Sequence, residues 1–339
     1  MKKYKHNVLF IGSFLSATRG SKGIAESLSE RLKEDGIEIK LVSTYENKIL
    51  RLIDILFAVI FSNSKKIHID VFSGSAFTIA DIASKLAKFR KKEILFTLHG
   101  GKLTEFATTK MSKIHQVFNR ADYIQTPSLF LQSFFQKEGF NIHYLPNSVS
   151  LEKFSYSAEN RKAFSLLWVR AFIPIYNPHI AVEILNEVKK KYPESTLTMV
   201  GPDKGELAST KLLATQLKIL NSITFTGAVA NNELEKYYQS HSIFLNTTSY
   251  ESFGVALIEA ALCGIPIVSN NVGEIPFLWS HKENIMLVEN NSVDEYKNSI
   301  YNLFEDPNLY SNLSKNALVK AEAFNWKNIK PTWMNLLVE

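Results

Sequence analysis

The sequence predicts an α/β protein of two doubly wound domains, and three observations lead to this prediction. The chain has 339 residues, which suits two domains of ordinary size. Short apolar runs alternate with longer helical patterns along its length, as in parallel sheets with crossover helices. A turn cluster, Pro146-Asn147-Ser148, separates two such arrays. We therefore expect one domain over residues 1–148 and another over residues 149–339.

Each array contains six expected strands, which are apolar runs bounded by turn signals. In the first array they are residues 7–11, 37–42, 66–72, 93–98, 123–126 and 142–144. In the second array they are residues 165–169, 196–200, 223–226, 243–246, 267–269 and 285–288. Residues 8–15 also resemble the apolar part of a signal peptide, but Gly12 and Ser13 interrupt the run, so a buried first strand is favoured.

Helices are expected between the strands, and two of them carry specific predictions. Residues 23–35 place Ile24, Leu28 and Leu32 on one stripe, which should face the core. Residues 49–61 form the most apolar segment, well short of the ~20 residues that span a bilayer. A buried helix is the interpretation we favour for that segment.

Composition and charge limit the class of protein. Hydrophobic residues make up 45% and charged residues 21%, which is ordinary for a soluble globular protein. The single cysteine, Cys263, excludes an intrachain disulfide framework, fits a reducing compartment and is expected to be a buried, inert thiol. Residues 1–150 hold 22 Lys and Arg against 13 Asp and Glu, a net charge of +9, and the remainder carries −3.

The basic half includes a short cationic segment interleaved with Leu86 and Phe89. Its members are Lys85, Lys88, Arg90, Lys91 and Lys92. Such a surface suits an anionic membrane, where each well-placed cation contributes about 1 kcal/mol. A solvated helix end explains it equally well, because Lys and Arg favour the last helical turn.

The most informative motif is residues 251–259, Glu-Ser-Phe-Gly-Val-Ala-Leu-Ile-Glu, which follows an expected strand. A helix starting at Gly254 would offer backbone N–H groups of residues 253–255 to an anion. On an ideal helix, Glu251 and Glu259 would be about 80° and ~12 Å apart. This is wider than the roughly 5–9.5 Å of a glycosidase dyad. An anion between two hydroxyl-binding carboxylates describes a sugar nucleotide; an ordinary amphipathic helix is the alternative.

Three further positions end expected strands, where ligands bind in parallel sheets. Arg170 follows residues 165–169, and its planar guanidinium suits a diphosphate. His99 follows residues 93–98 beside Gly100 and Gly101, and a site role is favoured over a structural one. The loop 12–23 is glycine-rich but lacks the spacing of a dinucleotide or P-loop motif, so a plain connector remains open.

These segments together resemble the retaining family 4 glycosyltransferases, and they occur in the order of that family. Residues 251–259 are similar to its acid-x7-acid motif, and residues 145–149 with Lys153-Phe154 to its interdomain "PNGV…F" signature. Residues 98–101, 199–201 and 225–227 are similar to its "HG", "VG" and "F-x-G" segments. The resemblance implies the GT-B fold, with two doubly wound Rossmann-like domains facing a cleft. It also implies that a last helix, about 326–337, packs back on the first domain.

The resemblance assigns roles to individual residues. Arg170, Glu251 and His99 would be the catalytic set, with Arg170 neutralising the leaving diphosphate and His99 contacting the transferred sugar. Ser252, Phe253, Gly254 and Val255 would help hold the donor sugar, and Glu259 would bind the ribose hydroxyls. Gly20, Gly23, Gly100 and Gly101 would face the acceptor and the donor phosphate. The family usually has a Lys shortly after the Arg; it is missing here, so Lys204 is the candidate substitute, or else a plain loop lysine.

The sequence therefore predicts a retaining glycosyltransferase that moves a sugar from a nucleoside-diphosphate sugar to a lipid-linked or saccharide hydroxyl. Assembly of a bacterial surface polysaccharide or glycolipid follows by analogy, and we expect a cytoplasmic location, peripheral on the inner face of the cell membrane. No cofactor and no metal are expected, because no Asp-x-Asp motif occurs. A phosphorylase or epimerase on the same scaffold and a non-catalytic nucleotide-sugar-binding protein stay open. A nucleic-acid binder has no recognition motif in its favour.

Overall fold

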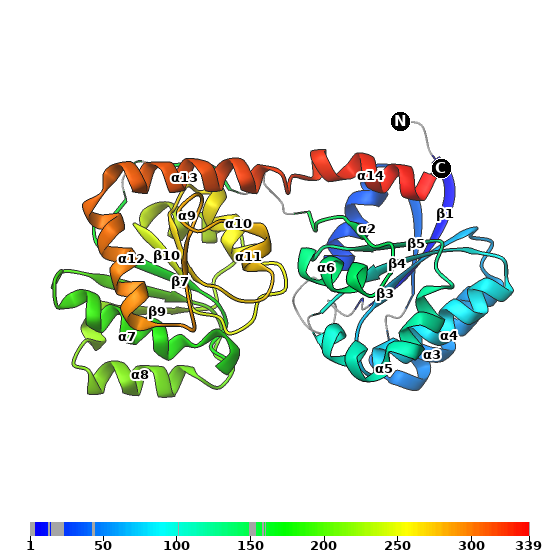
Figure 1. Cartoon of the computed structure of the whole chain (residues 1–339), viewed down its shortest axis with the longest axis horizontal. Helices are drawn as coiled ribbons and strands as arrows, with labels where there is room; N and C mark the ends of the chain where they lie inside the picture. The colour runs from blue at the N-terminus through cyan, green and yellow to red at the C-terminus, as the bar shows by residue number, and fades with distance from the viewer. Residues whose placement is uncertain are drawn as a thin grey trace. The chain divides into compact units, whose positions relative to one another are not determined.

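The computed structural model describes residues 4–12, 14, 24–42, 45–100, 102–148, 154–157, 159 and 161–338. Contacts between Cα atoms divide the chain into two compact units (Figure 1). Unit 1 comprises Met1–Ser148 and Lys327–Glu339, and unit 2 comprises Val149–Trp326. Unit 1 is thus built from two stretches of chain, whereas unit 2 is continuous.

Unit 1 contains a parallel six-stranded sheet in the order β2-β1-β3-β4-β5-β6. Its strands are β1 (Tyr4–Ile11), β2 (Ile37–Val42), β3 (Lys66–Val71), β4 (Glu93–Leu98), β5 (Tyr123–Thr126) and β6 (His143–Tyr144). The central strands are apolar on both faces and buried, as expected for a parallel sheet covered by helices. All carboxyl ends lie at one edge, which includes the ends of β3 and β4 side by side.

Six helices lie in the described residues of unit 1. They are α2 (Ile24–Glu34), α3 (Lys48–Phe61), α4 (Ser75–Phe89), α5 (Lys102–Phe118), α6 (Leu129–Lys137) and α14 (Trp326–Val338). In α2 the predicted stripe is wrong at its first position: Ile24 is exposed, and the buried residues are Glu26, Ser29 and Leu32. Of the other two predicted positions, Leu28 is half-buried and Leu32 is fully buried.

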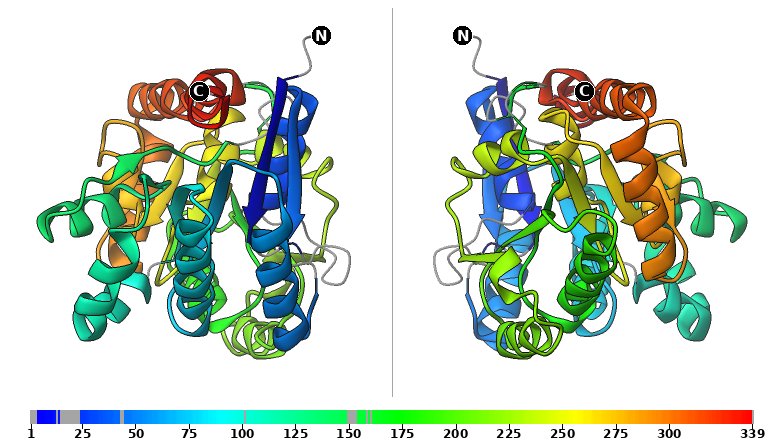
Figure 2. Two further views of the ribbon diagram at one scale, coloured as in Figure 1. Left: turned by 90° about the vertical axis from the view of Figure 1, so that its right-hand side faces the viewer. Right: turned by 90° about the vertical axis from the view of Figure 1, so that its left-hand side faces the viewer.

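The helix α3 forms where the sequence predicts one, but the expectation that it is buried is wrong. Ile55, Ala58 and Val59 face the core, while five large apolar side chains on the other side are exposed. They are Ile49, Leu50, Ile53, Phe57 and Phe61. Figure 2 (left) shows α3 and α4 side by side on one flank, and the two helices pack against each other. The apolar periodicity could not show which side of such a helix meets protein.

The helix α14 packs against unit 1 near β3, although α14 and β3 are far apart in the sequence. Trp333 is buried and its ring meets His68 edge-on, with the centroids 5.6 Å apart. The Lys66 ammonium donates to the Leu336 carbonyl oxygen at 2.9 Å, and Lys330 pairs with Asp35 at 2.5 Å. These contacts connect the end of the chain to strands made from its first 70 residues.

Unit 2 contains a second parallel six-stranded sheet in the order β12-β11-β10-β7-β8-β9. Its strands are β7 (Ser165–Val169), β8 (Thr196–Val200), β9 (Ile223–Gly227), β10 (Ile243–Asn246), β11 (Ile267–Asn270) and β12 (Met286–Val288). Its α-helices are α7 (Pro178–Lys189), α8 (Leu207–Gln216), α9 (Leu234–Ser240), α10 (Val255–Leu262), α11 (Ile275–Leu278), α12 (Val293–Glu305) and α13 (Pro307–Glu322). The described residues of unit 2 also include two single turns of 3₁₀-helix, η2 (Pro174–Tyr176) and η3 (Leu220–Ser222).

The strand order of unit 2 has a switch point between β7 and β10. The chain runs from β7 outward through β8 to β9, and it then returns to the other side of β7 for β10, β11 and β12. Loops that leave the carboxyl ends of two such strands diverge to opposite faces of the sheet and leave room between them. In unit 2 these are the loops that follow Val169 and Asn246.

Candidate active site

Arg170 and Glu251 flank the switch point of unit 2, and they contact each other. Arg170 is the first residue after β7, and Glu251 lies in the loop after β10. The Arg170 guanidinium donates to the Glu251 carboxylate and, at 3.2 Å, to Oδ1 of Asn246 at the end of β10. Its Cζ lies 5.0 Å from the centroid of the Tyr176 ring, within range of a cation–π contact.

This ion pair is largely removed from water. The Arg170 and Glu251 side chains are only 12% and 11% exposed. The Arg170 Nε atom is buried and has no hydrogen-bond partner among the described residues. A guanidinium has five N–H donors in a fixed fork, so part of this one remains available to another acceptor. The Glu251 carboxylate therefore balances the charge of Arg170, while the guanidinium keeps an N–H at Nε without a partner among the described residues.

A hydrogen bond from Glu274 and a close contact with Gly273 fix the backbone of Glu251. The Glu274 N–H at the start of α11 donates to the Glu251 carbonyl oxygen at 2.8 Å. Gly273 has a φ of 57°, and a Cβ there would lie 2.1 Å from the same oxygen. Only glycine allows this approach, because any side chain would push the loop away. Asn177 holds the other end of the loop, since its side-chain amide donates to the Thr247 carbonyl oxygen at 2.9 Å.

The helix α10 begins three residues after Ser252, at Val255. Gly254 precedes it with a φ of 86° and makes no side-chain cap. The first N–H groups of a helix have no partner within the helix and carry its positive dipole end, so an anion is favoured there. The Phe253 side chain is buried edge-on against Phe324, with the centroids 5.4 Å apart, so only its backbone can face a ligand. Ser252 and Val255 are exposed.

Glu259 lies on α10 and is half-buried. The Tyr238 hydroxyl donates to its Oε2 at 3.0 Å. Burial, and secondly the Glu259 charge, raise the pKa of Tyr238 well above its ordinary value, so this phenol remains a donor. Glu251 lies before the helix begins, so the spacing estimated for two acids on one ideal helix does not apply.

Lys204 is exposed on the loop that follows β8. The backbone N–H of Lys204 donates to the Phe172 carbonyl oxygen at 3.2 Å. The Phe172 backbone N–H donates to the Pro202 carbonyl oxygen at 2.9 Å. Gly201 makes the close approach possible, because a Cβ there would lie 1.8 Å from the Arg170 carbonyl oxygen. The loop of Lys204 thus runs beside the residues that follow Arg170, although its ammonium makes no hydrogen bond or ion pair with the residues that the structure describes.

In unit 1 the predicted site residue His99 has an acidic partner. Its Nε2 lies 3.0 Å from Oδ1 of Asp70, and its ring stacks on Phe72 with the centroids 5.0 Å apart. Burial alone would raise the pKa of Asp70, but the charge of and hydrogen bond from His99 outweigh it and the pKa is lowered. A Cβ at Gly12 would lie 2.5 Å from the Asp70 carboxylate, so any side chain there would have to displace that carboxylate.

The sequence analysis missed some residues of the site, and some residues that it predicted lie outside the described part of the structure. Asp70, Phe72, Tyr238 and Asn246 contact the predicted residues, yet none stands in a motif. An acid near the carboxyl end of a buried strand was the available signal for Asp70. Gly100 is exposed, with a φ of 81°. The predicted residues Gly20, Gly23 and Gly101 lie outside the residues that the structure describes.

Solved structures with the same architecture define the fold class as GT-B. Anabaena HepE in complex with UDP and glucose has a TM-score of 0.75 at 18% identity, over 98% of this chain and 99% of that one. Sucrose-phosphate synthase from Thermosynechococcus elongatus has a TM-score of 0.77 at 17% identity, over 98% of each chain. Identities this low establish the fold alone.

Residues 150–319 match the family described as "Glycosyl transferases group 1". The chain belongs to this family. It is 31% identical to an uncharacterized glycosyltransferase of Haemophilus influenzae over 157 residues, 46% of this chain. It is 28% identical to D-inositol 3-phosphate glycosyltransferase of Rhodococcus jostii over 161 residues, again 46%. The chain spans 44% of the length of the first relative and 36% of the second.

Proposed function

We propose that the protein is a retaining glycosyltransferase that transfers a sugar from a nucleoside-diphosphate sugar to a hydroxyl acceptor. The observation that carries this proposal is the position of Arg170 and Glu251, in contact across the switch point. The start of α10 and Glu259 follow on the same loop and helix. A cation with spare donors suits the diphosphate, and two carboxylates suit the hydroxyls of sugar and ribose.

The reaction would use the residues as follows. Arg170 and the first N–H groups of α10 would take up charge on the diphosphate as the sugar leaves. Glu251 would hold the sugar, and the diphosphate would compete with it for the Arg170 guanidinium. Lys204 would supply the second cation in place of the missing Lys. No metal is assigned a role, because the chain lacks the Asp-x-Asp motif that would hold one.

Relatives indicate which donors to test first. Anabaena HepE was solved with UDP-glucose, and a Mycobacterium tuberculosis relative is named as a GDP-mannose-dependent mannosyltransferase. The latter is 22% identical over 257 residues, 70% of this chain and 66% of its own. The acceptor would be a lipid-linked or saccharide hydroxyl in the assembly of a surface polysaccharide or glycolipid.

The first experiment is a thermal-shift panel with UDP, GDP, ADP, CMP and their common sugar conjugates. A ligand at ~100 times its dissociation constant should add about 2.7 kcal/mol of stability. We expect one nucleotide family to stabilise the wild type and Glu259→Ala to lose the effect. Glu194→Ala is the matched control, because Glu194 is exposed and lies just before β8, at the opposite edge of the sheet. No shift for any nucleotide would refute the donor site.

Turnover separates an enzyme from a binding protein. Arg170→Ala should lower donor consumption more than it weakens nucleotide binding, and Lys204→Ala should lower it less; Lys315→Ala, an exposed lysine on α13, is the control. The anomeric configuration of the product, read by NMR, tests retention. Donor that binds but is neither transferred nor hydrolysed would favour the non-catalytic alternative, whereas consumption without an acceptor would favour an epimerase.

A further inference from the structure

The outer side of α3 is the most apolar exposed surface on a single helix in the described part of the chain. Ile49, Ile53, Phe57 and Phe61 recur every four residues and therefore lie along one side. They are 70%, 49%, 62% and 67% exposed. A helix that is apolar on all sides is normally enclosed, so a face of this kind indicates a partner. No described helix is long and apolar enough to cross a bilayer.

The helix α4 adds an exposed aromatic ring next to this face. Phe89 at its last position is 81% exposed. The ends of α3 and α4 are joined by Lys92, whose ammonium donates to the Ser62 and Ser64 carbonyl oxygens at 2.8 and 2.6 Å. Phe61 and Phe89 therefore protrude at the same end of two neighbouring helices.

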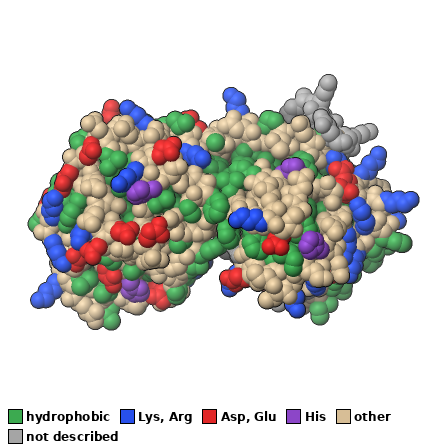
Figure 3. All heavy atoms as spheres, in the orientation of Figure 1, with side chains coloured by type: hydrophobic (Ala, Val, Ile, Leu, Met, Phe, Trp, Pro, Cys, Tyr) green, Lys and Arg blue, Asp and Glu red, His purple; other side chains and the backbone are tan. Residues whose placement is uncertain are grey.

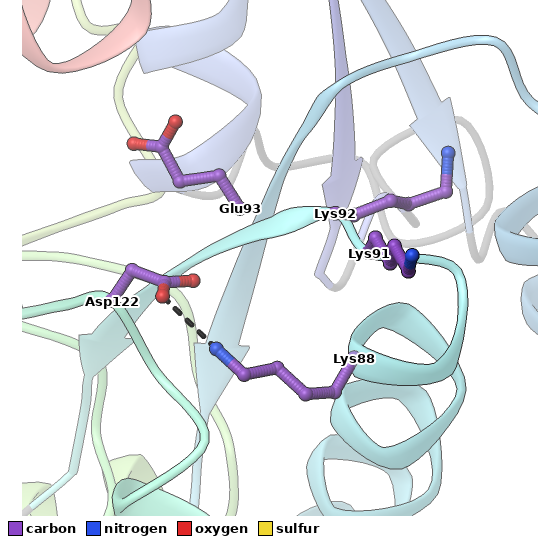
Figure 4. A pocket seen from close by; sticks show the side chains of 5 residues that line it. All are labelled: Lys88, Lys91, Lys92, Glu93 and Asp122. Atoms are coloured by element: carbon purple, nitrogen blue, oxygen red, sulfur yellow. Dashed lines mark hydrogen bonds and ion pairs between the residues drawn. The ribbon is translucent and has the colours of Figure 1, made fainter.

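A cationic border lies beside Phe89, at the end of α4. Lys85, Lys88, Arg90 and Lys91 are all exposed. Lys92 is the exception in the predicted basic segment, because it is buried and burial lowers its pKa. Three of these lysines, with Glu93 and Asp122, line a surface hollow of about 410 Å³ (Figure 4). In Figure 3, blue and green side chains interleave along the right-hand edge of unit 1.

The nearby acids do not cancel this border. Asp81 is shared by Arg120, Lys113 and Lys85, so its charge is already matched. Asp122 pairs with Lys88 at 3.0 Å, and Glu93 pairs with Lys66 at 3.2 Å. Exposed pairs of this kind are weak, so their lysines can exchange one anion for another. The border at the end of α4 therefore keeps a net positive charge beside the apolar face of α3.

We propose that the outer side of α3, with Phe89 and the cations at the end of α4, docks on an anionic lipid bilayer. We call this the α3–α4 surface. Its isoleucine and phenylalanine side chains would enter the boundary between head groups and acyl chains. The long stems of Lys85, Lys88 and Lys91 would lie along the apolar surface while their ammonium groups reach lipid phosphates.

Charge decides between a bilayer and a second copy of the chain. A two-fold dimer through α3 would bring two copies of the same cationic border toward each other, which is unfavourable. An anionic bilayer instead offers opposite charge to the border and an apolar interior to the face of α3. The proposal does not rest on the proposed catalytic function, because the α3–α4 surface would bind an anionic bilayer even in a protein without transferase activity.

The test is co-sedimentation of the full chain with vesicles of phosphatidylcholine alone or mixed equally with phosphatidylglycerol. We expect binding to the anionic vesicles and little to the neutral ones. Ile53→Gln/Phe57→Gln should weaken that binding roughly tenfold or more through the apolar contact, and Lys85→Gln/Arg90→Gln/Lys91→Gln by at least as much. Raising the salt concentration should remove the contribution of the cations only.

Matched controls keep the test decisive. Leu212→Gln/Val319→Gln removes two apolar side chains of unit 2 that are 59% and 69% exposed, and it should bind vesicles like the wild type. All mutated positions are exposed, so circular dichroism and nucleotide-induced thermal shifts should be unchanged. Wild type that ignores anionic vesicles overturns the proposal. So does a concentration-dependent dimer that the α3 variant abolishes, since the face would then belong to a second copy.

Discussion

Replacing Arg170 by Met should destabilise unit 2 by about 3 kcal/mol, because a buried Glu251 carboxylate would lose its cation. Two unit charges ~4 Å apart attract by about 4 kcal/mol at an effective dielectric constant near 20. Desolvation of both groups offsets part of this attraction. The change also removes the 3.2 Å hydrogen bond to Asn246 and the contact with the Tyr176 ring. Met keeps much of the apolar stem, so packing changes little.

A double-mutant cycle isolates the interaction. Glu251→Gln keeps the shape of the side chain and one acceptor oxygen, so its cost should be about 2 kcal/mol. If the two groups interact as described, the Arg170→Met/Glu251→Gln protein should be more stable than the sum of the single effects predicts, by about 1–3 kcal/mol. Urea unfolding of all four proteins, followed by circular dichroism, gives the four free energies of unfolding.

The Lys191–Glu305 pair on the surface of the same unit is the reference cycle. Both side chains are 49% exposed, so Lys191→Met/Glu305→Gln should show almost no coupling. A coupling between Arg170 and Glu251 as small as that of the reference pair would refute the reasoning. The loop after β10 would then be held by backbone contacts alone.

Three further predictions concern single positions. Burial lowers the pKa of His68 to about 4, which favours the neutral ring in the folded protein. The free energy of unfolding should therefore fall as the pH drops from about 6.5 toward 4. His68→Gln should remove about 3 kcal/mol of that pH dependence, and an unchanged pH profile in urea unfolding would contradict this. Gly273→Ala should lower the melting temperature and weaken nucleotide binding together, since its Cβ would displace Glu251; retained affinity in a titration would argue against this. Tyr238→Phe should cost about 1–3 kcal/mol and loosen nucleotide binding by leaving Glu259 with one donor fewer, as calorimetry can check.

The strands were predictable because buried parallel strands appear in the sequence as apolar runs with sharp ends. Six of them, including β4 and β7, have the predicted bounds, and most of the others differ by one residue. β1 begins three residues early, where the polar segment 4–7 gives no apolar signal. The all-round apolar pattern of α3 indicated a helix correctly and its burial wrongly, because periodicity does not show what lies outside.

Individual residues of the candidate site could be predicted from the sequence, but the contacts between them could not. Arg170 and Glu251 were singled out separately, from a strand end and from a motif. Their contact depends on β10 returning beside β7, and a sequence does not display strand order. Asp70 and His99 meet for the same reason, since β3 and β4 are neighbours. Partners that come from adjacent strands are therefore the ones that were missed.

The two-segment construction of unit 1 makes its folding depend on residues that are far apart in the sequence. Val149–Trp326 is one continuous stretch, so unit 2 contains all of its own segments without the residues that follow it. Unit 1 instead needs α14, because Trp333 of that helix packs on the His68 ring of β3. Removing residues 327–339 would therefore leave apolar surface of unit 1 open to chaperones or aggregation, while unit 2 would keep every segment of its fold.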